Sequence, residues 1–105
     1  METTLQRRKP PNPGRQEIKP QVDRVLNSAR EQAGNPALPE PIDDKQNLED
    51  DLCLGPRTKE ALATSYTAIA LQYLGGLPIS LTAAANCDTV GNAIDLVHRR
   101  ACGKH

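Results

Sequence analysis

Two side chains near the C-terminus have a spacing that could support chemistry. His98 and Cys102 stand at positions i and i+4, so a helix would place them on one face, close enough for a thiolate–imidazole pair or for two ligands of a metal ion. A structural zinc site needs further ligands, and nothing nearby completes the set. The sequence therefore favours a frayed C-terminal turn with a solvated His98 over a catalytic or metal site.

A cluster of acidic residues in the middle of the chain is a second candidate for a binding site. It consists of Asp43, Asp44, Glu49, Asp50 and Asp51. Calcium-binding loops place their oxygen ligands at alternating positions around an internal glycine, and this cluster has neither feature. The sequence favours a solvated acidic loop. Two alternatives stay open, contact with a basic partner surface and contact with the chain's own basic N-terminal residues.

The three cysteines, Cys53, Cys87 and Cys102, are odd in number and show no CxxC spacing. A disulfide framework is therefore not expected, and the chain is predicted to be a reduced, cytoplasmic protein. Cys53 and Cys87 are interpreted as small packing residues. The first residues contain no apolar leader, so no secretory signal is predicted.

Composition narrows the classes of partner. The 13 basic and 13 acidic residues give a formal net charge of zero, so no global charge favours nucleic acid or a membrane surface. Tyr66 and Tyr73 are the only aromatic residues, which disfavours base stacking on single-stranded nucleic acid and favours an aliphatic helical bundle over a β-sandwich. Residues 61–87 carry no charge, but Gly75 and Pro78 interrupt them. We expect core there, not a membrane span.

The elements that must position these residues follow from apolar periodicity and helix breakers. Residues 1–17 are basic and rich in proline, so they are predicted to form a mobile tail. Apolar residues recur at helical spacing from Ile18, with Pro20 in a first turn, and Gly34 ends this helix. A long acidic loop follows over residues 35–55, and its leucines are expected to point inward.

Three further helices complete an all-α domain over residues 18–102. The second runs from about Pro56 to Leu74, with one apolar stripe of Leu62, Tyr66, Ile69 and Tyr73. A short third helix over 81–85 begins after Ser80, and Asp88 or Thr89 caps a final helix that extends to Ala101. The predicted fold is a four-helix bundle with a long first loop and a short third helix.

The order of these parts resembles the acyl carrier protein family, in which the second helix starts at the site of prosthetic-group attachment. Asn47 to Leu52 is similar to the family's sequence before that site, and Thr89 to Asp95 is similar to the start of its last helix. The resemblance covers roughly residues 18–101 and implies an acyl-carrier-like bundle.

The attachment position departs from that family. The resemblance implies an Asp-Ser-Leu triplet whose serine carries phosphopantetheine, but Gly55, Pro56 and Arg57 occupy those positions. Pro56 has no hydroxyl to esterify, and a proline suits the first position of a helix. No cofactor is therefore expected. The helix that follows also lacks the run of acidic side chains that family members present to basic enzymes.

The leading hypothesis is a protein-interaction module, not an enzyme: an acyl-carrier-like protein without its prosthetic group. The predicted partner-binding residues are Leu54, Gly55, Pro56, Arg57 and Lys59. The partner is expected to be a protein, with an enzyme of lipid or polyketide synthesis as one candidate. A membrane partner is not expected, and nucleic acid is disfavoured.

Two alternative functions stay open. A working acyl or peptidyl carrier would bear phosphopantetheine on another alcohol, for which Thr58, Ser65 and Ser80 are weak candidates because polar or capping roles account for them. A small nucleic-acid-binding protein would use the basic tail, and its retention on DNA would fall with added salt.

Overall fold

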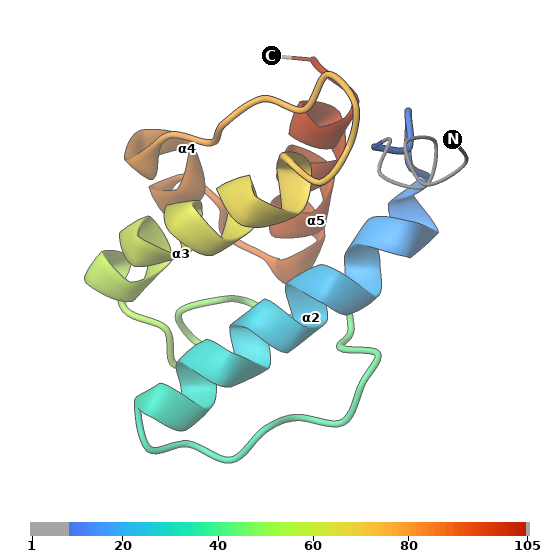
Figure 1. Cartoon of the computed structure of the whole chain (residues 1–105). Coiled ribbons are helices and arrows are strands. Elements are labelled where there is room, and N and C mark those ends of the chain that lie inside the picture. The colour runs from blue at the N-terminus through green and yellow to red at the C-terminus, as the bar shows by residue number, and fades with distance from the viewer. Residues whose placement is uncertain (1–8, 105) are drawn as a thin grey trace.

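The structure is a computed structural model that describes residues 9–104, and in that range it contains four α-helices and no strand (Figure 1). They are α2 (Arg15–Gln32), α3 (Pro56–Ala70), α4 (Leu81–Ala85) and α5 (Val90–Ala101). The predicted all-α class is confirmed for this range. Residues 1–8 of the predicted mobile tail lie outside the described residues, whereas residues 9–17 are described: Pro13 is buried and Arg15 begins α2. Among the helices described, none is long and apolar enough to cross a bilayer.

Helix α2 begins earlier than predicted, at Arg15 instead of Ile18. Its start is closed by Glu17, whose Oε1 accepts a hydrogen bond from the Gly14 N–H at 3.2 Å, while the Glu17 N–H donates to the Gly14 carbonyl at 3.0 Å. These two reciprocal hydrogen bonds cap the helix. The sequence did not predict this cap, because residues 1–17 are rich in proline. Pro20 consequently lies beyond the first turn. It has no N–H to donate to the Gln16 carbonyl, but Gln16 is exposed, so water can supply the missing hydrogen bond.

The long loop between α2 and α3 is anchored at both ends. Leu48, Leu52 and Leu54 are completely buried, as predicted. Arg30 of α2 is itself buried, and its guanidinium donates hydrogen bonds to the carbonyls of Pro36 at 3.0 Å and Leu52 at 2.7 Å. One side chain therefore holds the beginning and the end of the loop against the same helix; the first part of the loop runs below α2 in Figure 1.

Helix α3 carries the predicted apolar stripe but ends at Ala70, short of Leu74. Leu62, Tyr66 and Ile69 are buried, and Tyr73 stays buried although it lies in the turn that follows. That turn brings the chain so close to the last carbonyls of α3 that a Cβ on Gly76 would overlap the Ala70 oxygen. Only glycine fits there, and the close approach explains the earlier helix end.

The two C-terminal helices begin where the sequence predicted. The Ser80 side chain accepts a hydrogen bond from the Ala83 N–H at the start of α4, and Thr89 accepts one from the Asn92 N–H at the start of α5, each at 3.1 Å. Such caps satisfy backbone donors that the first turn leaves unpaired. The four helices pack around one core, with α3 against α4 and α2 against α5 (Figure 1).

Candidate functional site

An exposed corner forms where the long loop enters α3. Gly55 is the N-cap of this helix, Pro56 is its first residue, and both are exposed together with Arg57. A Cβ added to Gly55 would meet no atom within 4 Å, so the space beside Gly55 is free of protein atoms. Arg57 makes no ion pair with any residue in the described range. We call Gly55, Pro56 and Arg57 the α3 corner.

Two residues predicted to belong to this surface lie inside the protein. Leu54 is completely buried, and Lys59 is 4% exposed. The Lys59 ammonium pairs with the Glu49 carboxylate at 2.9 Å. The backbone N–H of Lys59 donates to the Gly55 carbonyl at 2.9 Å. The prediction that Leu54 and Lys59 contact a partner is therefore wrong, because their side chains hold the corner from beneath.

The three alcohols named as alternative attachment residues occupy other positions in the fold. Thr58 and Ser65 are half-buried in α3, and Ser65 lies in the middle of the helix. Ser80 is exposed, but its oxygen caps α4. The first helical residue after the long loop is Pro56, whose side chain has no oxygen.

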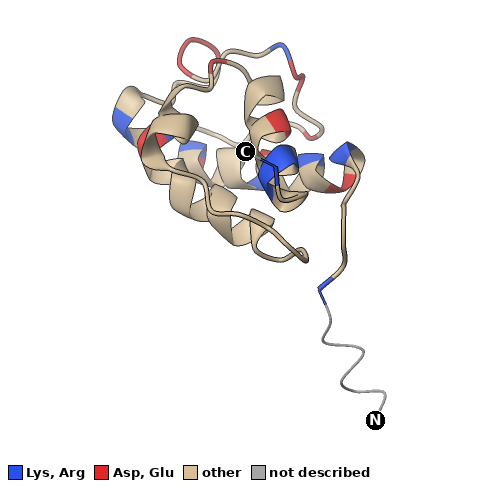
Figure 2. Cartoon of the chain, turned by 90° about the horizontal axis from the view of Figure 1, so that it is seen from above, with Lys and Arg blue, Asp and Glu red and all other residues tan. Residues whose placement is uncertain are grey.

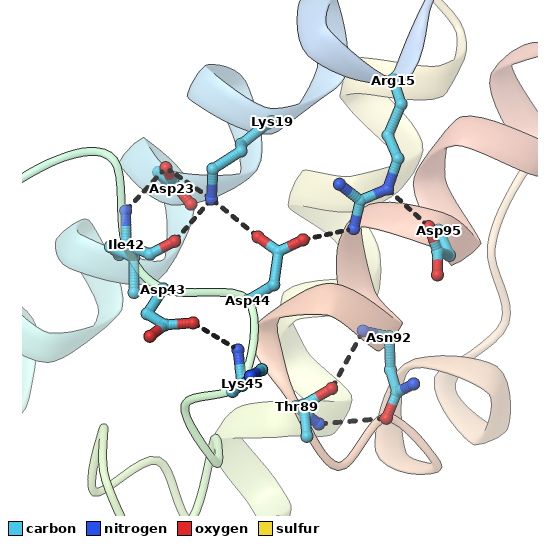
Figure 3. A network of polar contacts seen from close by, with 10 residues as sticks. All are labelled: Arg15, Lys19, Asp23, Ile42, Asp43, Asp44, Lys45, Thr89, Asn92 and Asp95. Atoms are coloured by element: carbon cyan, nitrogen blue, oxygen red, sulfur yellow. Dashed lines mark hydrogen bonds and ion pairs between the residues drawn. The ribbon is translucent and has the colours of Figure 1, made fainter.

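Two carboxylates of the acidic loop pair with basic residues of the same chain: Glu49 with Lys59, as described above, and Asp44 in the cluster of Figure 3. Asp44 accepts from the Lys19 ammonium at 3.0 Å and from the Arg15 guanidinium at 2.8 Å, and Arg15 also pairs with Asp95 of α5 at 2.7 Å. This cluster joins the loop, α2 and α5. Of the alternatives for the acidic residues, contact with the chain's own N-terminal cations applies to Asp44.

These contacts change the ionisation of the paired groups. Partial burial opposes the charged form of Asp44, but hydrogen bonds from Lys19 and Arg15 outweigh it and hold the pKa of that carboxyl below its ordinary 3.8. The hydrogen bond to Asp95, with a smaller contribution from Asp44, raises the pKa of Arg15. Arg15 and Lys19 are thus held in ion pairs, which leaves them poorly placed to bind phosphates.

A buried carboxylate of α2 was not foreseen from the sequence. Asp23 is completely buried; its Oδ2 accepts from the Ile42 N–H at 3.1 Å and lies 3.4 Å from the Lys19 ammonium (Figure 3). The only signal was an acidic residue beside the apolar Val22 on the inner side of an amphipathic helix. Asp23 therefore fixes the loop to α2, while its Oδ1 has no hydrogen-bond partner among the described residues.

His98 and Cys102 meet the N-terminal segment, so the predicted solvated turn is wrong. His98 Nε2 lies 2.9 Å from the Pro13 carbonyl oxygen, and the Cys102 thiol lies 3.7 Å from the same atom. Both residues are half-buried. The pair fastens residues before α2 to the end of α5. Within residues 9–104, no group of three potential metal ligands is close enough to hold an ion.

The two remaining cysteines differ in their surroundings. Cys87 is buried and packs in the core, as predicted, and burial raises the pKa of its thiol, an effect partly offset by nearby Lys59. Cys53 is exposed, so its interpretation as a packing residue is wrong. Its backbone has a φ of 60°, which turns the side chain of this loop residue away from its buried neighbours Leu52 and Leu54.

Comparison with family models, curated proteins and solved structures found no match to this chain. The resemblance to acyl carrier proteins therefore rests on the sequence strings and on the order of the elements.

Proposed function

We propose that this chain is a non-enzymatic interaction module, acyl-carrier-like in its arrangement, that binds a protein partner through the α3 corner and carries no phosphopantetheine. The observation that carries the proposal is an exposed cation on a rigidly supported helix start, which pairs with no carboxylate of residues 9–104. Arg57 projects from the first turn of α3, while the nearby Lys59 is already neutralised by Glu49.

The support beneath the corner lowers the entropic cost of binding. The Leu54 N–H donates to the Leu48 carbonyl at 2.9 Å, and the Lys59 N–H donates to Gly55. Together with the buried leucine side chains, these bonds fix the backbone before a partner arrives. A preordered surface loses less conformational freedom on association, so a small exposed patch can serve as an anchor.

The chemistry of the corner indicates the kind of partner. Arg57 is a planar donor that suits a carboxylate on the partner, and arginine is enriched among residues that dominate binding energies. Pro56 adds an apolar surface with a fixed backbone angle. We therefore expect an acidic protein surface opposite Arg57, and an enzyme of lipid or polyketide synthesis is one candidate.

The test is a quantitative pull-down with the full chain as bait. Proteins retained by the wild type should be lost from Arg57→Glu and kept by Arg24→Glu, a matched charge reversal at an exposed residue of α2. Charge reversal in a specific contact puts like charges together, whereas elsewhere on the surface it has little effect. If every copurifying protein stays bound to Arg57→Glu, the assignment of the corner is wrong.

A further inference from the structure

A cleft lies between α2 and the long loop, away from the α3 corner. Its volume is about 390 Å³, and it is lined by Gln16, Lys19, Pro20 and Asp23 of α2 and by Glu40 and Pro41 of the loop. The four residues of α2 follow the helical repeat and therefore share one face of the helix. Ligand sites in proteins occupy about 300–1,000 Å³, so the cleft is large enough for a small organic group. We call it the α2–loop cleft.

The floor of the α2–loop cleft contains an acceptor without a partner. Asp23 is completely buried, unlike the other residues that line the cleft. Its Oδ2 accepts a hydrogen bond from the Ile42 N–H at 3.1 Å, whereas its Oδ1 has no hydrogen-bond partner among residues 9–104. A buried charged group with unsatisfied hydrogen-bonding capacity lowers stability. A ligand that donates a hydrogen bond to Oδ1 would remove that cost.

Lys19 cannot supply the missing donor. An ammonium group has three hydrogens, and that of Lys19 already has three acceptors around it (Figure 3). They are the Ile42 carbonyl, Asp44 Oδ1 at 3.0 Å and Asp23 Oδ2 at 3.4 Å. Lys19 therefore has no hydrogen left for Asp23 Oδ1, and none for an anionic ligand. The cleft favours a ligand that donates hydrogen bonds.

The charge around the α2–loop cleft favours a cationic ligand. Figure 2 shows acidic positions in red on α2 as well as on the long loop. The ion-pair cluster beside the cleft holds two cations and three carboxylates, namely Arg15, Lys19, Asp23, Asp44 and Asp95. Glu40 adds a fourth carboxylate. Asn27, one helical turn after Asp23, donates to Glu40 Oε2 at 3.2 Å, which holds this carboxylate beside α2. Such an excess of carboxylates attracts positive charge.

The lining of the cleft suits an organic cation better than a metal ion. Calcium and magnesium bind six or more oxygen ligands, whereas no three potential metal-binding side chains come together anywhere in residues 9–104. The rings of Pro20 and Pro41 instead give the cleft apolar walls, against which an alkyl chain can pack. A guanidinium group adds planar donors that match the geometry of a carboxylate.

We propose that the α2–loop cleft binds an alkylguanidinium or alkylammonium group, which donates to Asp23 Oδ1 and pairs with the Glu40 carboxylate. Its alkyl chain packs against the two proline rings. Essentially none of Oδ1 is exposed in the free chain, so the ligand must displace a side chain at the rim, where Gln16 and Glu40 are both exposed. The proposal does not rest on the proposed function, because the cleft shares no residue with the α3 corner.

A nuclear magnetic resonance titration of the isotope-labelled full chain with n-butylguanidinium chloride, at constant ionic strength, tests the proposal. The backbone amide of Ile42 is the reporter because it donates to Asp23. Its signal should shift saturably, and n-butanol, which has the same alkyl chain without the charge, should leave it unchanged. Equal binding of N-acetylarginine amide would assign the site to an arginine of another protein, whereas its exclusion would assign the site to a small molecule.

Three variants identify the carboxylates that bind the probe. Glu40→Gln should raise the dissociation constant of n-butylguanidinium by about threefold through loss of an exposed charge pair. Asp23→Asn should raise it by about tenfold or more, because a charge-assisted hydrogen bond is lost in a buried setting. Glu31→Gln is the matched control, since Glu31 is an exposed carboxylate of α2 outside the cleft. It should bind like the wild type.

Circular dichroism must show that each variant keeps its helical content, because Asp23 also holds the loop. Glu40→Gln changes an exposed residue and keeps the test decisive if Asp23→Asn does not fold. The absence of saturable shifts in the wild type would overturn the proposal. So would equal binding of n-butanol, an affinity unchanged in Glu40→Gln, or an equal loss of affinity in Glu31→Gln.

Discussion

The hydroxyl of Tyr66 provides a test of how this core is built. Tyr66 is completely buried in α3, and its oxygen has no hydrogen-bond partner within the described residues. Burial raises the pKa of this phenol, with a smaller contribution from Cys87, so the group stays neutral. A buried polar group that gains no hydrogen bond lowers stability. Replacing Tyr66 by phenylalanine should therefore stabilise the fold.

The size of the effect follows from the burial. An unsatisfied hydroxyl costs about 1–3 kcal/mol on the scale of protein substitutions. Removing the oxygen leaves a small void, which offsets part of this gain. We expect Tyr66→Phe to raise the free energy of unfolding by about 1 kcal/mol. For a domain of this size, such a change raises Tm by roughly 4–8 °C.

Tyr73 is the matched control, because the same substitution there should have the opposite sign. Its hydroxyl accepts a hydrogen bond from Gln21 Nε2 at 2.8 Å, and the residue is 6% exposed. Tyr73→Phe removes one of the two acceptors of that amide, which keeps its bond to the Glu17 carbonyl at 3.1 Å, and should lower the free energy of unfolding by about 1 kcal/mol. Urea unfolding followed by far-ultraviolet circular dichroism measures both changes. A Tyr66→Phe variant less stable than the wild type would refute the reasoning.

Three further predictions concern the contacts of the loop and α5. Asp44→Asn should lower stability near neutral pH. Because the folded-state pKa of Asp44 lies below its ordinary 3.8, its contribution is present above that value and is lost as pH falls through the folded pKa. Urea titrations should therefore show the difference from wild type shrinking in acid, and a constant difference would contradict the ion-pair account. Arg30→Lys cannot keep both bonds to Pro36 and Leu52 and should cost about 1.5–3 kcal/mol by urea unfolding, whereas an unchanged midpoint would disprove the anchoring role. Thr89→Ala should lower stability by about 1 kcal/mol in urea unfolding through loss of the α5 cap, whereas Thr89→Ser should keep most of the wild-type stability.

Elements specified by neighbouring residues were predictable from the sequence. Helix α5 has a capping threonine at its start and apolar residues such as Ile94 and Val97 at helical spacing, and both signals lie within the helix itself. The short α4 follows a capping serine in the same way. The inward leucines of the loop were also predictable, because large apolar residues in an acidic segment gain stability from burial. Ile42 of the same loop is buried as well, and it was not predicted.

Features that depend on distant residues were not predictable. Lys59 looked like a surface cation because nothing near it in sequence indicated that Glu49 would meet it in a buried setting. His98 and Pro13 are separated by most of the chain, yet they share a contact. A charged side chain was predicted to lie at the surface. That prediction fails where a residue distant in sequence neutralises the charge.

The helix start on which the candidate site is centred was predicted at the right residue, but two of the five residues assigned to the site, Leu54 and Lys59, are buried. Pro56 was correctly predicted as the first helical residue after the long loop, from proline's fixed backbone angle. The apolar exposure of Leu71 and Leu74 was missed, because an uncharged stretch was equated with core. The turn imposed by Gly76 ends α3 early and leaves these two leucines at the surface.

The central claim is that this chain carries no phosphopantetheine, because the proline at the start of α3 has no oxygen to form the ester. Coexpression of the full chain with a broad-specificity phosphopantetheinyl transferase, followed by intact-mass measurement, tests it directly. A typical carrier protein in the same cells verifies that the transferase is active. The account predicts only the unmodified mass of this chain, and a species heavier by one phosphopantetheine group would contradict it.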